Sequence, residues 1–78
     1  MMQVSQAIMQ IFRDYHVGRN KTIAVPALMR SVAKWDRELQ DQYAKGFTEL
    51  EELGFLRGEK DGYTVWLLDA GYDHLYPD

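Results

Sequence analysis

The stretch ELEELGFLRGEKDGYTVWLLDAGYDHL (residues 49–75) begins in a helical pattern and leaves it at a glycine. Across residues 37–53, large apolar side chains recur at intervals of three and four residues, as on one face of an amphipathic helix. Asp36 is a suitable N-cap, and Gly54 suits the left-handed position that ends many helices. The pattern predicts one helix over residues 37–53. Gly46 inside it either permits close approach of another helix or is simply tolerated.

A β-hairpin is predicted directly after this helix. The segments 55–59 and 63–67 flank Lys60-Asp61-Gly62, and an Asp-Gly pair favours a type I′ turn, because both residues tolerate a positive φ. Asp69 follows the second strand and is placed to cap a short final helix. The stretch thus predicts a helix, a hairpin and a second helix in that order.

The N-terminal half predicts two more helices and a short strand. Apolar residues recur at helical spacing over residues 3–16, and Gly18 is placed to end that helix. Residues 22–24 favour a strand. Pro26 suits the first turn of a helix over residues 26–33, because its missing N–H would have no partner there.

Length and composition indicate one small domain covering residues 1–78. Apolar residues make up 46% of the chain, which is enough for a core, and there is no cysteine to form a disulfide or a thiolate metal site. No apolar run approaches the roughly 20 residues that span a bilayer. No segment resembles a signal peptide, so we expect a cytoplasmic protein that does not enter a membrane.

The order of these elements resembles the winged helix-turn-helix superfamily. In many bacterial winged-helix regulators a helix with two leucines ends in a Gly that two apolar residues follow. A polar hairpin loop comes next. After it come a Tyr, a strand with Leu and a capped final helix. The matching residues here are Leu50, Leu53, Gly54, Phe55, Leu56, Tyr63, Leu67, Leu68, Asp69, Gly71 and Leu75. The resemblance implies an α+β fold with a three-helix core, a short first strand, a C-terminal β-hairpin wing and a short final helix.

The resemblance also implies a function, namely transcription regulation through DNA binding, with many such regulators acting as homodimers. In that superfamily the helix at residues 37–53 would enter the DNA major groove and the hairpin would touch the backbone or the minor groove. Four basic side chains, Lys21, Arg30, Lys34 and Arg37, would form a rim that contacts phosphates; alternatively Lys34 and Arg37 pair with nearby acids. The candidate DNA-binding residues are Lys21, Arg30, Lys34, Arg37, Gln40, Lys45, Thr48, Arg57 and Lys60.

The charge distribution departs from that expectation. Residues 1–37 carry six basic and two acidic side chains, whereas residues 38–78 carry three basic and ten acidic ones. Because phosphate neutralisation supplies most non-specific DNA affinity, an acidic reading helix favours weak DNA binding. The alternative function is a winged helix that docks a protein, as an accessory or inhibitor protein would. The candidate partner-binding residues are then Trp66, Tyr63, Glu38 and Asp41.

No arrangement of residues indicates an enzyme. His74 follows Asp73 by one residue and Asp69 by five, which is poor spacing for a metal-binding pair, and no serine has a histidine partner visible in the sequence. His16, the other histidine, suits the end of a helix. We therefore expect no catalytic activity, no metal and no cofactor.

Overall fold

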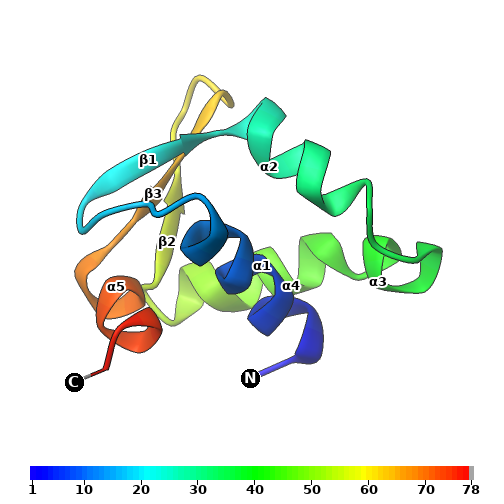
Figure 1. Ribbon diagram of the computed structural model, residues 1–78, viewed down its shortest axis with the longest axis horizontal. Coiled ribbons are helices and arrows are strands. Elements are labelled where there is room, and N and C mark those ends of the chain that lie inside the picture. The colour runs from blue at the N-terminus through cyan, green and yellow to red at the C-terminus, as the bar shows by residue number, and fades with distance from the viewer. Residues whose placement is uncertain (78) are drawn as a thin grey trace.

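Five helices and three strands form from residues 1–77, the part of the chain that the computed structural model describes (Figure 1). In chain order they are α1 (Gln3–Asp14), β1 (Lys21–Ala24), α2 (Val25–Val32), α3 (Arg37–Asp41), α4 (Tyr43–Glu52), β2 (Leu56–Gly58), β3 (Thr64–Leu67) and α5 (Asp69–Leu75). The α+β class expected from the sequence is confirmed.

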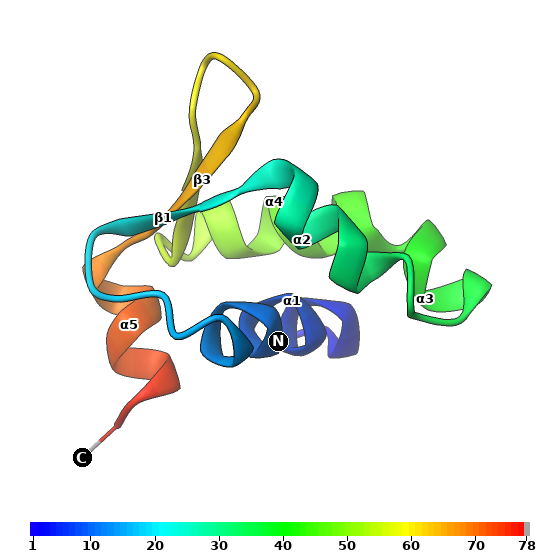
Figure 2. The same cartoon turned by 45° about the horizontal axis from the view of Figure 1, so that its top comes forward.

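The strands form one antiparallel sheet in the order β1-β3-β2. Ile23, Leu56, Val65 and Leu67 are buried on one face of it, as the alternation of strand side chains requires. The N–H of Val25 donates to the carbonyl oxygen of Tyr63 at 2.8 Å. This bond ties the start of α2 to the hairpin, which stands away from the helices in Figure 2.

Helix α1 supplies much of the core. Val4, Ile8 and Phe12, spaced by four residues, are fully buried, so the apolar stripe predicted for this segment faces inward. The helix packs mainly against α4 and also contacts α2 and α5. In Figure 2 it lies on the side of the domain away from the hairpin.

Gly46 lies where α4 meets α1. A Cβ atom placed on it would stand 2.6 Å from Cγ1 of Val4 and 3.2 Å from the backbone nitrogen of Ser5. Those distances leave no room for a side chain, so the prediction that Gly46 permits close approach of another helix is confirmed.

The single helix predicted over residues 37–53 is wrong, because α3 and α4 are separated at Gln42. The N–H of Gln42 donates to the carbonyl oxygen of Leu39, three residues back, at 3.1 Å. The side-chain amide of Gln40 donates to the carbonyl oxygens of Ala33 and Trp35, at 3.2 and 2.9 Å. These bonds hold α3 against the preceding turn. The sequence contains no helix breaker at this point, so its pattern does not predict the interruption.

Both α1 and α4 end with a residue in the left-handed conformation. The predicted residue is correct for α4 and wrong for α1. After α4, Gly54 has a φ of 76° and takes the left-handed position, as predicted. After α1 that position belongs to His16, with a φ of 54°, and not to Gly18. The N–H groups of His16 and Val17 donate to the carbonyl oxygens of Arg13 and Phe12, which completes a Schellman motif two residues earlier than expected.

The hairpin turn differs from the type I′ turn that was predicted. Gly62 has a φ of 75°, but Asp61 has no positive φ, and a type I′ turn needs both. The carbonyl oxygen of Glu59 accepts from the N–H of Gly62 at 3.1 Å, which centres the turn on residues 60–61. The Asp61 carboxylate accepts from the N–H of Tyr63 at 2.8 Å and stabilises the loop locally.

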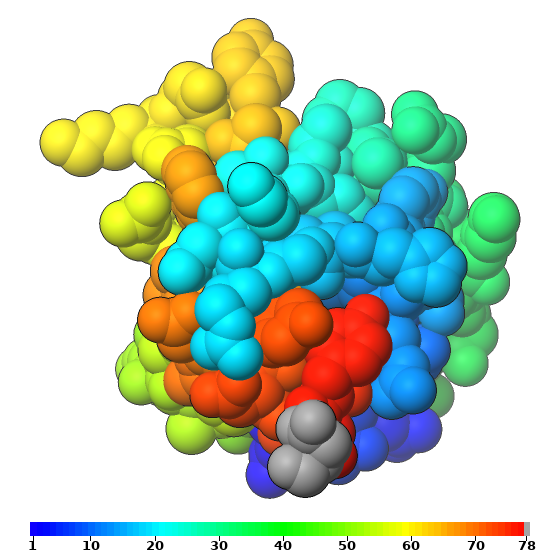
Figure 3. All heavy atoms as spheres, turned by 60° about the vertical axis from the view of Figure 1, so that its left-hand side comes forward, coloured from blue at the N-terminus to red at the C-terminus, as the bar shows by residue number. Residues whose placement is uncertain are grey.

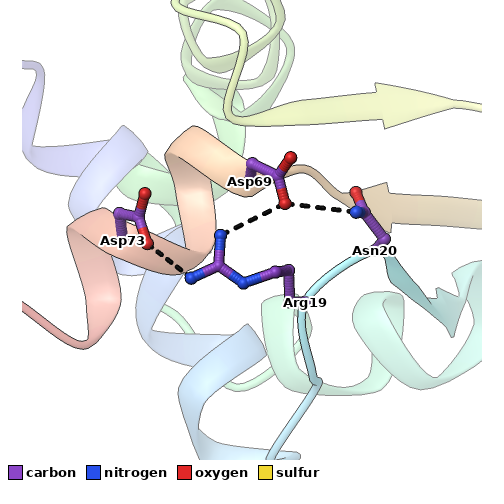
Figure 4. A network of polar contacts seen from close by, with 4 residues as sticks. All are labelled: Arg19, Asn20, Asp69 and Asp73. Atoms are coloured by element: carbon purple, nitrogen blue, oxygen red, sulfur yellow. Dashed lines mark hydrogen bonds and ion pairs between the residues drawn. The ribbon is translucent and has the colours of Figure 1, made fainter.

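Asp69 does not cap α5, contrary to the prediction. The N-cap residue is Leu68, and Asp69 is the first residue of the helix. Its carboxylate accepts from Arg19 at 3.2 Å and from Asn20 at 3.1 Å, while Asp73 accepts from Arg19 at 2.7 Å (Figure 4). The carboxylate therefore fastens α5 to the loop before β1.

Candidate functional site

An open groove of about 360 Å³ lies between α4 and the hairpin. Four large side chains line it: Val25, Tyr43, Phe47 and Val65. Much of the remaining lining is small, namely Ala44 and Thr48 from α4 and Gly58 and Gly62 from the hairpin. We call this feature the helix–hairpin groove. Figure 3 shows how far the hairpin, in yellow, projects from the rest of the surface.

The aromatic side of the groove belongs to a row of packed rings. The ring centroids of Trp35 and Tyr43 are 6.4 Å apart, and those of Tyr43 and Phe47 are 5.9 Å apart. All three side chains are partly buried and pack against the core. The groove is thus backed by a fixed aromatic surface.

Gly58 keeps the hairpin side of the groove open. It pairs with buried Val65 in the β2–β3 register, so a side chain at position 58 would point to the same face as Val65. A Cβ atom at Gly58 would lie 4.0 Å from two ring carbons of Phe47. A larger residue at this position would occupy the groove.

Two ionisable side chains line the groove. Burial, and to a smaller extent the charge of Glu51, raises the pKa of Tyr43 to about 12, so its hydroxyl stays protonated at physiological pH. Glu59 also borders the groove, but its carboxylate accepts from the indole Nε1–H of Trp66 at 2.6 Å and lies 3.9 Å from the guanidinium of Arg57. Arg57 and Trp66 pair next to Gly58 and Val65 in the β2–β3 register, so they point to the opposite face of the sheet. The carboxylate therefore lies on the face away from the groove.

Several predicted DNA contacts on the helix and hairpin face have acidic neighbours. Arg37 lies 3.9 Å from Asp41 on the same helix. Arg57 lies near Glu59 and over the Trp66 ring, 5.4 Å from its centroid. The alternative predicted acidic partners for both Lys34 and Arg37; within residues 1–77 Arg37 has one and Lys34 has none.

The other basic candidates are more dispersed. Lys21, Arg30 and Lys34 are exposed on β1, on α2 and after α2, and none of them lines the helix–hairpin groove. No ion pair involves them within residues 1–77. Lys45 and Lys60 are exposed on α4 and in the hairpin loop.

Two further candidates differ in their surroundings. Thr48 is exposed and lines the groove, so it can meet a ligand. Gln40 is half-buried, and its amide is already bonded to two carbonyl oxygens of the preceding turn. The amide of this candidate DNA contact is thus engaged in holding α3 against the preceding turn.

The residues predicted for a protein partner do not form one cluster. Trp66 is half-buried and takes part in the contacts with Glu59 and Arg57, while Tyr63 is 69% exposed at the hairpin. Glu38 and Asp41 are exposed on α3 and do not line the groove. The groove itself is built largely from residues that the sequence suggested were core or strand.

Two such residues are Phe47 and Gly58. Phe47 belongs to the apolar stripe of the predicted helix, and nothing in that pattern separates a groove-lining residue from a core one. The signal available at Gly58 was the glycine itself, because a glycine inside a strand often marks a close approach by a ligand or backbone.

Two other hollows lie beside contacts that join helices to the rest of the fold. One, of about 480 Å³, lies beside Arg13, Arg19 and Tyr72. The Arg19 guanidinium there is held by Asp69 and Asp73 and covers the Tyr72 ring at 4.6 Å. The other, of about 450 Å³, lies where α4 meets the start of α1, beside Glu49. Both adjoin contacts that join elements of the fold.

Comparison with protein-family models, curated proteins and solved structures returns no match. Within residues 1–77, no helix has the length and apolar character needed to cross a membrane. The same residues bring no three His, Asp or Glu side chains together as a metal site would require. The groove and the charges around it therefore carry the functional interpretation.

Proposed function

We propose that this chain is a winged-helix domain that binds a protein partner at the face between α4 and the hairpin. The order of helices and strands supports the winged-helix assignment, with β1 preceding α2 and the hairpin following α4. The sheet order β1-β3-β2 and the projecting hairpin support it as well.

The observation that carries the proposal is the apolar character of the helix–hairpin groove. In a DNA-binding winged helix this face meets phosphates and needs unpaired Lys and Arg side chains. Here it presents the rings of Tyr43 and Phe47. Aromatic and apolar side chains with a polar surround are also the composition found at the centre of protein interfaces.

The cations on this face are too few for strong DNA binding. They are Arg37, Lys45, Arg57 and Lys60, and two of them, Arg37 and Arg57, each lie 3.9 Å from a carboxylate. Strong DNA binders make about six to ten phosphate contacts, so the few that this face can offer give weak binding.

DNA binding is the second candidate function, because one observation favours it. Lys21, Arg30 and Lys34 are exposed and have no ion-pair partner within the described part of the chain. These residues would contact DNA from β1 and α2, and the domain would then act as a transcription regulator.

Photo-crosslinking from the groove tests the proposal directly. A photoreactive amino acid replaces Thr48, which is exposed at the groove, and in a matched variant replaces Gln6, which is exposed on α1. In cells that contain the natural partner, we expect a discrete protein adduct from position 48 and none from position 6. Nuclease treatment should leave that adduct intact.

A duplex titration provides the complementary measurement. We expect a generic DNA duplex at low salt to leave the amide signals of α3, α4 and the hairpin nearly unmoved. Salt-sensitive shifts across residues 30–48 and 57–62, together with a nuclease-sensitive adduct at position 48, would replace the protein-binding proposal with the DNA-binding one.

A further inference from the structure

Helix α2 presents a second surface, separate from the helix–hairpin groove. Five exposed residues recur on it at helical spacing, and none of them lines the groove: Pro26, Met29, Arg30, Ala33 and Lys34. We call this surface the α2 face. We infer that it docks an acidic segment of another protein. An apolar side chain of that segment covers Met29, and its carboxylates pair with Arg30 and Lys34.

Apolar residues lie on both sides of α2. Its sequence is VPALMRSV, in which six of the eight side chains are apolar and only Arg30 is charged. Leu28 and Val32 are buried in the core and account for the inward side. Pro26 and Met29, the latter 36% exposed, lie on the outward side. A helix that is apolar on both sides is normally covered on both, so the α2 face is suited to a partner.

The charge of the α2 face specifies what covers it. Residues 15–35 contain no acidic side chain. Arg30 and Lys34 are both exposed, four residues apart, and no ion pair involves either of them within residues 1–77. Unpaired cations beside an apolar surface attract carboxylates and oppose a basic segment. The complementary occupant is therefore acidic.

The α2 face fits a protein segment better than a phosphate backbone. Besides its two cations it offers no side-chain hydrogen-bond donor, because Pro26, Met29 and Ala33 have none. Proteins that hold phosphates supplement Arg and Lys with hydroxyl and amide side chains. Protein interfaces, in contrast, are enriched in Met and Arg, and the flexible Met side chain adapts to the shape of its partner.

A displayed library of random peptides tests this inference. Peptides are selected on the wild-type chain and depleted on a variant that carries both Met29→Gln and Lys34→Gln. Both side chains are exposed and glutamine is a good helix former, so the variant should remain folded. If its amide spectrum shows otherwise, Lys34→Gln alone replaces it, because Lys34 lies after the end of α2. Lys45→Gln, at an exposed lysine of α4, is the matched control.

We expect the enriched peptides to carry Asp or Glu close to a bulky apolar residue and to shift the amide signals of Met29, Arg30 and Lys34. Met29→Gln should weaken a synthesised peptide by about three- to tenfold, as loss of one or two buried methylene contacts does. Lys34→Gln should weaken it by about two- to fivefold, an effect that shrinks with added salt. Lys45→Gln should leave its affinity unchanged.

Other outcomes overturn the inference in distinguishable ways. Failure to enrich acidic peptides, or binding that both substitutions leave unchanged, would mean that the α2 face docks no such segment. If a generic DNA duplex shifts the α2 signals, and Lys34→Gln weakens it while Met29→Gln does not, the surface belongs to phosphates. Concentration-dependent α2 shifts without peptide would assign it to a second copy. Photo-crosslinking from position 48 tests the helix–hairpin groove separately, so the two proposals can fail independently.

Discussion

Ser5 Oγ donates a hydrogen bond of 2.6 Å to Oε1 of Glu49, so the first turn of α1 is joined to α4 through two side chains. The same carboxylate oxygen accepts from the backbone N–H of Met2 at 2.9 Å. A carboxylate from α4 thus occupies the N-terminal end of α1, where the helix dipole and unpaired N–H groups favour a negative charge. The hydrogen bond from Ser5, followed by that from Met2, lowers the pKa of Glu49.

The contact makes stability depend on pH in the acid range. A carboxyl whose pKa is lower in the folded than in the unfolded state stabilises the fold above its unfolded pKa, and this contribution is lost as pH falls through the folded value. We expect Glu49→Gln to reduce the free energy of unfolding at neutral pH and to flatten its decline below about pH 4.5. Urea unfolding at a series of pH values measures both effects.

Glu52→Gln is the matched control for that series, because Glu52 is an exposed carboxylate on the same helix. Its unfolding free energy should follow that of the wild type across the pH range. If Glu49→Gln and Glu52→Gln behave alike, Glu49 has no special part in fastening α1.

Gly46→Ala should destabilise the domain, although alanine is the better helix former. The added Cβ would approach Val4 to 2.6 Å and the Ser5 backbone to 3.2 Å, which forces α1 away from α4. Overpacking of this kind typically costs about 1–3 kcal/mol. Chemical denaturation checks the value, with Gly58→Ala as a near-neutral control. A stabilised Gly46→Ala variant would mean that the two helices can separate freely.

His16→Gly should stabilise the domain. His16 is exposed and holds a φ of 54°, a conformation that costs an L-residue about 1–2 kcal/mol relative to glycine. Glycine also gains freedom in the unfolded state, so we expect a net gain of about 0.5–1 kcal/mol. A rise in thermal midpoint would show it. A fall would reveal that the imidazole makes a stabilising contact.

Tyr43 should be the source of a stability loss at alkaline pH. Its pKa is raised to about 12, so between pH 10 and 12 the unfolded chain ionises this tyrosine while the folded chain does not. The free energy of unfolding therefore falls as pH rises through that range, and Tyr43→Phe should show a smaller fall. Denaturation at increasing pH makes the comparison. Equal slopes for the two proteins would contradict burial of the hydroxyl.

The order of elements could be predicted from the sequence because local signals specify it. Apolar periodicity marked α1 and α2, Gly54 marked the end of α4, and Asp36 capped α3 with a bond of 2.9 Å to the N–H of Leu39. Each of these signals lies within a few residues of the structure that it determines.

The differences arise where distant contacts decide the outcome. Asp69 does not cap α5 because its carboxylate bonds Arg19 and Asn20, which lie in the other half of the chain. The groove could not be predicted for the same reason, because residues that are separated in the sequence form it. Phe47 and Gly58 become neighbours only when the hairpin folds back beside α4.

The strand order β1-β3-β2 leaves both outer strands with one unpaired row of backbone groups. Such rows are templates for aggregation when they are long and uncharged. β1 spans four residues and begins with Lys21, and β2 spans three and has Arg57 at its centre. Because both edge strands are short and carry a charged side chain, we expect the chain to stay dispersed at high concentration.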